Sequence, residues 1–326
     1  MTAGPAVAVA LGDSITVGVG DTVGPDARHG AGWAAHLATV LRVGRFRNLA
    51  SNGSRARDVV GGQLTEALRL RPALATVLVG GNDVLRSDFS PREIESALAR
   101  TVGALASTGS DVILVRLPVI GLFELAPRAV RRVMRRRVAV VNAAVDAAAA
   151  AARQEPGRVM VVDGAEAIES AGAGAWHIDR VHPSPAGHRK LALEVARAWL
   201  EEAPRTGSAI ATQGGGAPSE ALSAGAAASA PARSEAVSEV APPLAALAAR
   251  LPSAPDPPSW WQRAGWLVVK GIPWTWRRGG DFLPGLIRAV VSDLRSDQMM
   301  SPGSAIAGIA DSGLDPRKRM KRRGPA

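Results

Sequence analysis

A serine near the start of the chain has the setting of a nucleophile. Residues 7–11 are five consecutive apolar residues, and Gly12, Asp13 and Ser14 follow them directly. Such an apolar run is typical of a parallel strand that is buried on both faces. Gly12 allows a sharp bend, so Ser14 is predicted just past the carboxyl end of this strand, where the loops of an open α/β sheet form a crevice. Many serines follow strands without a catalytic role, so a catalytic role for Ser14 depends on partners elsewhere in the chain.

A base for this serine is found far along the chain. A serine hydroxyl needs a base to accept its proton, and a third group must hold that base in one tautomer. Asp179 and His182 lie three residues apart, within the segment Trp176-His-Ile-Asp-Arg-Val-His-Pro183. The carboxylate can therefore reach the imidazole within a single turn. The alternative interpretation is a loop histidine beside a helix cap.

Two further residues have the chemistry of an oxyanion hole. A tetrahedral intermediate needs hydrogen-bond donors that point at its oxyanion. Gly53 and Asn82 each follow a predicted strand. The backbone N–H groups of Ser14 and Gly53 and the side-chain amide of Asn82 would supply three donors. Taken singly, the glycine and the Asn82-Asp83 pair are also common turn residues.

The elements that must position these residues alternate between strand and helix. Apolar runs predict strands at residues 7–11, 45–50, 74–79, 111–117 and 158–163, and the intervening patterns predict helices at 32–43, 57–70, 91–107, 124–153 and 184–202. This alternation indicates one domain, residues 1–203, with a parallel sheet covered on both faces. Ser14, Gly53, Asn82 and His182 then all fall at the same edge of that sheet.

These four residues, in this order, resemble the SGNH (GDSL-like) hydrolase family. Gly12-Asp13-Ser14 matches its first block, Gly53 the second, Gly80-Gly-Asn-Asp83 the third and Asp179-Arg-Val-His182 the fifth. The resemblance covers residues 5–202. The first block reads Gly-Asp-Ser-Ile, with isoleucine where leucine is usual, and we expect this exchange of apolar residues to be harmless.

The resemblance implies a fold, an activity and a role for each residue. The fold would be a flavodoxin-like three-layer α/β/α sandwich with a central five-stranded parallel sheet. The activity would be hydrolysis of carboxylic acyl esters, with a carbohydrate O-deacetylase or a thioesterase of the same fold as the alternatives. Ser14 would be the nucleophile, His182 the base and then the acid, and Asp179 the orienting carboxylate. Ser14, Gly53 and Asn82 would form the oxyanion hole.

Composition argues against a cofactor or a metal. The chain has no cysteine, and its five histidines form no spaced ligand pair. It also lacks a Walker A loop and the Gly-x-Ser-x-Gly elbow of α/β-hydrolases. We therefore expect an enzyme that needs no cofactor.

The remainder of the chain changes character twice. Residues 204–258 are dominated by Ala, Pro, Ser and Gly, which predicts a disordered linker. Residues 259–295 hold five of the eight tryptophans and are predicted to be an amphipathic, interfacial segment, and residues 296–326 a basic disordered tail. Residues 259–326 carry 12 basic and 5 acidic side chains, a net charge of about +7 out of +10.

This charge and the tryptophans favour peripheral contact with an anionic membrane, because tryptophan prefers the headgroup zone and basic residues are attracted to anionic lipid. Packing on the hydrolase domain or in an oligomer interface is the alternative. Nucleic-acid binding is not favoured, since no nucleic-acid fold accompanies the basic run. A second basic feature is the group of six arginines between Arg128 and Arg137, which is either a solvated face or a contact for an anionic substrate.

The amino terminus lacks the basic and apolar regions of a signal peptide, and no apolar stretch is long enough for a membrane span. We therefore expect a cytoplasmic protein, in part peripheral at the inner face of the membrane. The main hypothesis is a serine hydrolase acting on a small-molecule or lipid acyl ester. The rival from another class is a membrane-surface interaction protein that acts through its tail.

Overall fold

The computed structural model describes residues 6–23, 27–202, 242–256, 259–266, 268–269, 284–292 and 295. Five parallel strands form one sheet: β1 (Val7–Gly12), β2 (Arg45–Asn48), β3 (Leu74–Leu78), β4 (Asp111–Arg116) and β5 (Val159–Asp163). Their order across the sheet is β2-β1-β3-β4-β5. This order reverses at β1, and in open α/β sheets such a reversal is where the loops at the carboxyl edge diverge and ligands bind.

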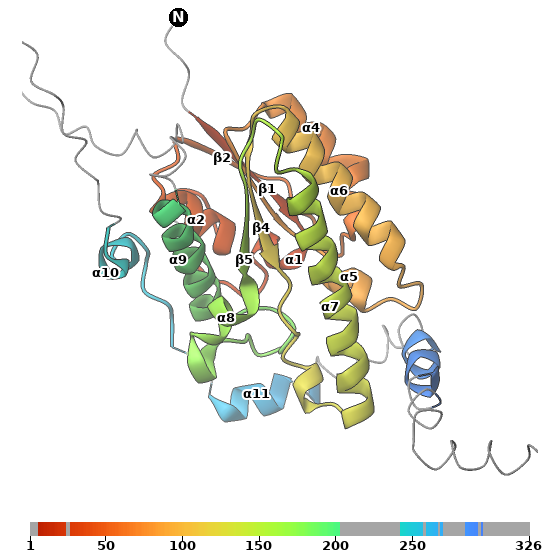
Figure 1. Cartoon of the computed structure of the whole chain (residues 1–326). Coiled ribbons are helices and arrows are strands. Elements are labelled where there is room, and N and C mark those ends of the chain that lie inside the picture. The colour runs from red at the N-terminus through yellow and green to blue at the C-terminus, as the bar shows by residue number, and fades with distance from the viewer. Residues whose placement is uncertain are drawn as a thin grey trace, which may run out of the picture.

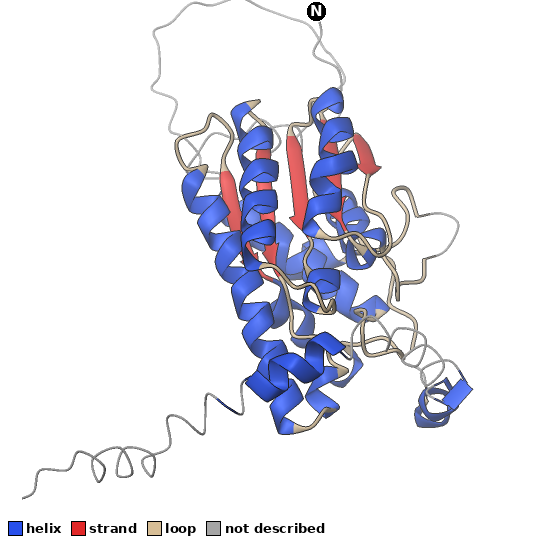
Figure 2. Cartoon of the chain, turned by 90° about the vertical axis from the view of Figure 1, so that its right-hand side faces the viewer, coloured by secondary structure: helices blue, strands red, loops and turns tan. Residues whose placement is uncertain are grey.

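Helices cover both faces of the sheet, as Figures 1 and 2 show. On one face α2 (Trp33–Val40) packs against α9 (Pro185–Glu202), and on the other α6 (Pro91–Ser107) packs against α4 (Leu64–Leu70) and α7 (Arg128–Ala151). The shorter elements are α1 (Ser14–Val17), α3 (Ala56–Asp58), the π-helix η1 (Val59–Gln63), α5 (Gly81–Val84), the 3₁₀ turns η2 (Phe123–Leu125) and η3 (Gly172–Gly174), and α8 (Gly164–Glu169), α10 (Leu244–Ala248) and α11 (Trp260–Trp266). The predicted three-layer α/β/α fold is confirmed.

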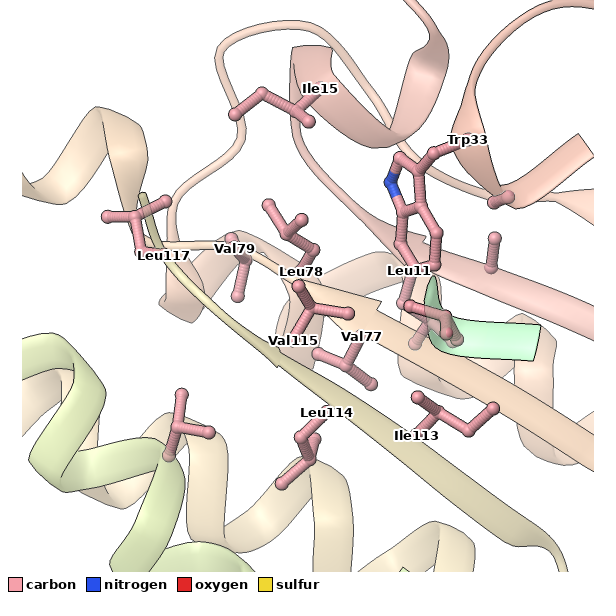
Figure 3. Close-up of a cluster of buried hydrophobic side chains, with 14 of the residues drawn as sticks. Leu11, Ile15, Trp33, Val77, Leu78, Val79, Ile113, Leu114, Val115 and Leu117 are labelled. Atoms are coloured by element: carbon pink, nitrogen blue, oxygen red, sulfur yellow. The ribbon is translucent and has the colours of Figure 1, made fainter. Parts of the chain in front are cut away.

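The core lies between the sheet and these two helical layers. Figure 3 shows side chains of β1, β3 and β4 in one buried cluster, in which Trp33 of α2 lies beside Leu11 of β1. Val9, Ala10 and Leu11 are fully buried, which explains why β1 carries no polar residue. α6 illustrates the helical counterpart, because Ser90 caps it by accepting a hydrogen bond from the N–H of Glu93 and its buried residues recur along one stripe (Ile94, Ala97, Leu98, Thr101, Val102, Leu105 and Ala106).

The structure differs from the predicted elements at two helices. The helix predicted from residue 124 begins only at Arg128, because Pro127 occupies its N-cap and lacks the N–H of a helix interior. The helix predicted over 57–70 is three elements, with the π-helix η1 between α3 and α4. The short helices α1, α5 and α8 were not predicted, since four to six residues are too few for an apolar period to be recognised.

The arginines of α7 do more than form a solvated face. Arg137 is buried and donates from Nη1 to the carbonyl oxygens of Val84 and Arg86, both at 2.9 Å. Arg135 pairs with the Glu124 carboxylate at 2.7 Å. Arg137 therefore holds the carboxyl end of α5, the short helix that carries Asn82.

Part of the predicted linker differs from the expectation of disorder. Residues 203–241, 257–258 and 296–326 lie outside the described residues, but 242–256 are described and include α10. Leu247 is fully buried in the core, and Arg250 Nη1 donates to the Val40 carbonyl at 2.5 Å. These contacts and the bond from Arg189 Nε to the Pro252 carbonyl at 2.8 Å attach the stretch to the domain, although its composition indicates a linker. Among the described residues, no helix is long and apolar enough to cross a bilayer.

Candidate active site

The turn after β1 presents Ser14 at the start of a helix. Asp13 is the N-cap of α1, and its Oδ1 accepts the N–H of Ile15 at 3.0 Å. Gly12 is required just before it, since a Cβ there would collide with the Leu78 carbonyl oxygen of the neighbouring strand. Ser14 is therefore the first residue of α1, with its backbone N–H at a helix amino terminus. Such N–H groups have no partner inside the helix and favour negative charge.

The loop between α8 and α9 brings a histidine to this serine. Nε2 of His182 lies 2.8 Å from Oγ of Ser14, although the two residues are 168 positions apart in the chain. On its other side, Nδ1 of His182 lies 2.8 Å from Oδ2 of Asp179. Because a carboxylate only accepts, Nδ1 carries the proton, and the lone pair of Nε2 faces the serine hydroxyl.

Asp179 is held as an anion by the donors around it. Its Oδ1 accepts the backbone N–H groups of Val181 at 2.8 Å and of His182 at 3.0 Å. Burial raises the pKa of this carboxyl, but the contacts from the His177 and His182 imidazoles outweigh burial and hold the pKa of Asp179 well below its usual range. Asp179 is thus charged and oriented toward His182 at neutral pH.

The other two predicted residues lie beside each other after β2 and β3. Residues 51–54 form a turn closed by the Ser54 N–H on the Ser51 carbonyl at 3.2 Å, with Gly53 at φ +81° in its third position. Nδ2 of Asn82 donates to the Ser54 carbonyl at 3.0 Å. This bond joins the Gly53 turn to α5, and an amide nitrogen has a second N–H to offer.

The residues 10–190 match the model of the GDSL-like lipase/acylhydrolase family. The chain belongs to this family. Membership makes it a hydrolase of carboxylic esters and confirms the resemblance drawn from the four sequence blocks. The matched span begins within β1, ends within α9 and contains the other four strands of the sheet.

Solved structures with similar folds include two named enzymes. One is an acetylxylan esterase from Geobacillus stearothermophilus, at 25% identity and a TM-score of 0.48, covering 62% of this chain and 96% of that one. The other is LAE5, an α/β hydrolase from the metagenome of Lake Arreo, Spain, at 26% identity and a TM-score of 0.47, covering 61% and 96%. No curated protein matches the sequence.

A glutamine that sequence reasoning missed supports the turn that presents Ser14. Gln63 accepts the Gly12 N–H at 2.8 Å and donates to the Gly12 carbonyl at 2.9 Å, as a neighbouring strand would. It also donates to Oγ of Ser54 at 3.2 Å. Gln63 ends the π-helix η1, an irregularity that often marks a functional site. Nothing in its spacing from Ser14 in the sequence indicates this contact.

Two buried carboxyl groups lie behind the site. Asp83 accepts the Ala56 N–H at 3.0 Å and Nε of Arg55 at 3.2 Å, which ties the segment after Gly53 to α5. Burial raises the pKa of Asp13 to about 7, and the nearby Asp83 carboxyl adds to this, while His182 opposes it. At mildly acidic pH Asp13 is therefore neutral. It then caps α1 without adding a negative charge beside His182 to that of Asp179.

A second polar cluster was also missed, and it holds the loop after α1. The Asp21 carboxylate accepts the Gly32 N–H at 2.8 Å, contacts Nε2 of His36 at 2.7 Å and binds Nη1 of Arg189 at 2.8 Å. His188 accepts the Trp33 N–H and donates to the Val19 carbonyl at 3.0 Å, and burial lowers its pKa to about 4, so it is neutral.

This Asp21 cluster also bears on the catalytic geometry. Within the loop it holds, Gly20 leaves no room for a Cβ against the Pro183 carbonyl oxygen, one residue after His182. The loop that follows Ser14 is therefore packed directly on the loop that carries His182. In the described part of the chain, no group of three or more metal-ligating side chains occurs, these clusters included.

Proposed function

We propose that this hydrolase cleaves carboxylic acyl esters through an acyl-enzyme on Ser14, with His182 as general base and acid and Asp179 as its orienting carboxylate. The observation that carries the proposal is the unbroken hydrogen-bond series from Asp179 through His182 to Oγ of Ser14, at 2.8 Å for each step. Nucleophile, base and orienting group in mutual contact are the geometric signature of this chemistry.

In acylation, Oγ of Ser14 attacks the carbonyl carbon of the ester while its proton moves to Nε2 of His182. The imidazolium that forms is stabilised by Asp179. The tetrahedral intermediate collapses as Nε2 returns the proton to the leaving alkoxide, which departs as an alcohol. In deacylation, water attacks the acyl-enzyme, again with His182 accepting and then returning a proton, and the carboxylic acid and free Ser14 result.

The oxyanion of both intermediates is assigned to the three donors at the sheet edge. The Ser14 N–H belongs to the first turn of α1, and Gly53 lies at the tip of an exposed turn. Asn82 is the second residue of the short helix α5. Their placement is supported by the bond from Asn82 to the Ser54 carbonyl. Removal of one such donor typically costs about 10²–10³ in kcat.

The proposal is tested by covalent capture of the nucleophile. A fluorophosphonate probe should form one adduct per chain, and mass spectrometry of the digested protein should place it on the peptide that contains Ser14. The rate at which the protein hydrolyses a short-chain p-nitrophenyl ester should fall in proportion to the fraction of chains that carry the probe. Absence of an adduct on this peptide, together with no turnover of any acyl ester, would contradict the mechanism.

The substrate itself is proposed as a small-molecule or lipid acyl ester. A panel that varies acyl chain length and the leaving group, including acetylated sugars and thioesters, separates an esterase or lysophospholipase from a carbohydrate O-deacetylase or a thioesterase. Rates that rise with acyl chain length would favour lipid substrates, and rates restricted to acetyl groups on sugars would favour the deacetylase.

A second proposal concerns peripheral contact of residues 259–326 with anionic membranes, which would place the enzyme in the cytoplasm and in part at the inner membrane face. The supporting observation is where apolar side chains are exposed. The large hydrophobic residues exposed in the described part of the chain are Trp261, Val268, Val269, Ile287 and Val291, all within this region.

The helical residues 284–292 explain how such a surface is held on the domain. Leu286 is buried in the core, and Gly285 leaves no room for a Cβ against Ser87. The opposite side exposes Ile287 and Val291, one turn apart, beside the exposed Arg288. The inner side of this helix is thus fixed to the domain, and its outer side presents apolar residues and a cation. Such an outer side suits an anionic lipid surface.

Liposome flotation tests this contact with the full chain. Wild-type protein should float with vesicles that contain phosphatidylglycerol, less so in high salt, and poorly with phosphatidylcholine alone. The double variant Ile287→Ser/Val291→Ser should float less while keeping its activity on a soluble ester. Ala139→Ser, an exposed alanine on α7, serves as the control. Equal flotation of wild type and double variant would show that this helix is not the contact.

A further inference from the structure

The loop that carries the proposed base is closed by a backbone hydrogen bond between two histidines. The backbone N–H of His177 donates to the His182 carbonyl at 2.9 Å, and Trp176 pairs with Pro183 as an antiparallel bridge. The Arg180 N–H donates to the His177 carbonyl at 2.9 Å, and Arg180 takes φ +55°. The loop therefore folds back on itself with Asp179 between the two imidazoles.

Both imidazoles converge on one oxygen atom. Oδ2 of Asp179 lies 2.8 Å from Nδ1 of His182 and 3.2 Å from Nδ1 of His177. Nδ1 of His177 is buried and has no hydrogen-bond partner among the described residues, so the Asp179 oxygen at 3.2 Å is the acceptor nearest to hand, although the side chain as a whole is 33% exposed. The edge of His177 that is closed to water is thus the edge that faces the Asp179 carboxylate.

We propose that His177 is a positioning residue for the triad, which acts by donating its Nδ1–H to Oδ2 of Asp179. This inference rests on the proposed function, because it assigns His177 a role only through Asp179 and His182. The carboxylate then has two backbone donors on Oδ1 and two imidazole donors on Oδ2, so it has one rotamer in which all four are satisfied.

The shared oxygen has an electrostatic consequence for His182. A carboxylate that accepts from two imidazoles divides its charge between them, so His177 moderates the hold of Asp179 on the proton of His182. The low pKa of Asp179 is consistent with this, as it reflects contacts from both imidazoles. Among the described residues, the ion pair of His177 is with Asp179 of its own loop, and the residue of the neighbouring loop that packs against the Cβ atoms of His177 and His182 is Gly20, which carries no charge.

Two substitutions separate donation from mere packing. His177→Leu removes the donor at similar volume, whereas His177→Asn keeps an N–H at the position of Nδ1. For His177→Leu we expect kcat/KM for a p-nitrophenyl ester to fall about 2- to 10-fold, the effect of one lost hydrogen bond. The acidic limb of its pH profile should also move to higher pH, because Asp179 then acts on His182 alone. His177→Asn should restore most of the rate.

Thermal unfolding of each variant shows whether the protein remains folded. If His177→Leu does not fold, His177→Gln takes its place, because glutamine displaces the donor by one methylene. His29→Asn controls for loss of a histidine away from the site, since His29 packs on Phe46 of β2. An unchanged rate and pH profile in His177→Leu, or an equal loss in His177→Asn, would overturn the role of His177. If Ser14→Ala remains active, the proposed function fails instead, so the two failures are distinguishable.

Discussion

Replacing Ser14 by alanine should lower kcat for a p-nitrophenyl acyl ester by about 10⁴-fold or more, with no loss of fold. The reason is that Oγ of Ser14 is the atom that would be acylated, and among the described residues it is the hydroxyl that lies 2.8 Å from Nε2 of His182. Ser14 is only partly buried and its side chain holds no other contact in the turn, whose shape is set by Gly12 and Asp13. Steady-state kinetics and circular dichroism measure the two quantities.

A double variant sharpens this expectation. If Ser14 and His182 act as one unit, Ser14→Ala/His182→Ala should be no slower than either single variant, because each alone already disables the unit. Ser107→Ala, which removes an exposed hydroxyl at the end of α6, provides the matched control and should keep full activity. A Ser14→Ala protein with a tenth or more of the wild-type rate would refute the assignment of the nucleophile.

Replacing Asp21 by alanine should lower the free energy of unfolding by about 3–5 kcal/mol, because it leaves a buried cation without its partner. The Asp21 side chain is fully buried, and that of Arg189 is 8% exposed, with 2.8 Å between the paired atoms. Chemical denaturation at pH 7 measures the change. The control is Asp146→Ala, which breaks a pair with Arg116 that is 38% and 46% exposed and should cost at most about 1 kcal/mol.

The pH dependence of this contribution has a defined sign. Burial raises the pKa of Asp21, but the His36 and Gly32 hydrogen bonds outweigh it, and the pKa falls to about 2. A carboxyl whose pKa is depressed in the folded state stabilises it above the unfolded pKa of about 4, and this stabilisation is lost as the pH falls toward 2. The wild type and Asp21→Ala should therefore converge in stability at low pH. A gap that stays constant between pH 7 and pH 3 would contradict this account.

The fold could be predicted to within a few residues because its signals are local. Strands β1, β3 and β4 are apolar runs, and the capped start of α6 is written in Ser90, Pro91 and Glu93. Where elements are short or depend on distant partners, local patterns fail. The π-helix at Gln63 bonds to the Gly12 backbone, 51 residues away, and the α10 stretch depends on the burial of Leu247 and on the bond from Arg250 to the Val40 carbonyl, 210 residues away.

By itself, the sequence determined the family, the order of strands and helices, and the residue types that could perform ester hydrolysis at one sheet edge. These follow from residues near each block, since an apolar period, a glycine bend or an Asp-x-x-His spacing needs no distant partner. Only the tertiary structure decided that Ser14 meets His182, that Gln63 and the Asp21 cluster hold the two loops together, and that His177 shares the oxygen of Asp179. Such contacts depend on how the loops pack across the carboxyl edge of the sheet, and that packing is set by the burial of the whole domain.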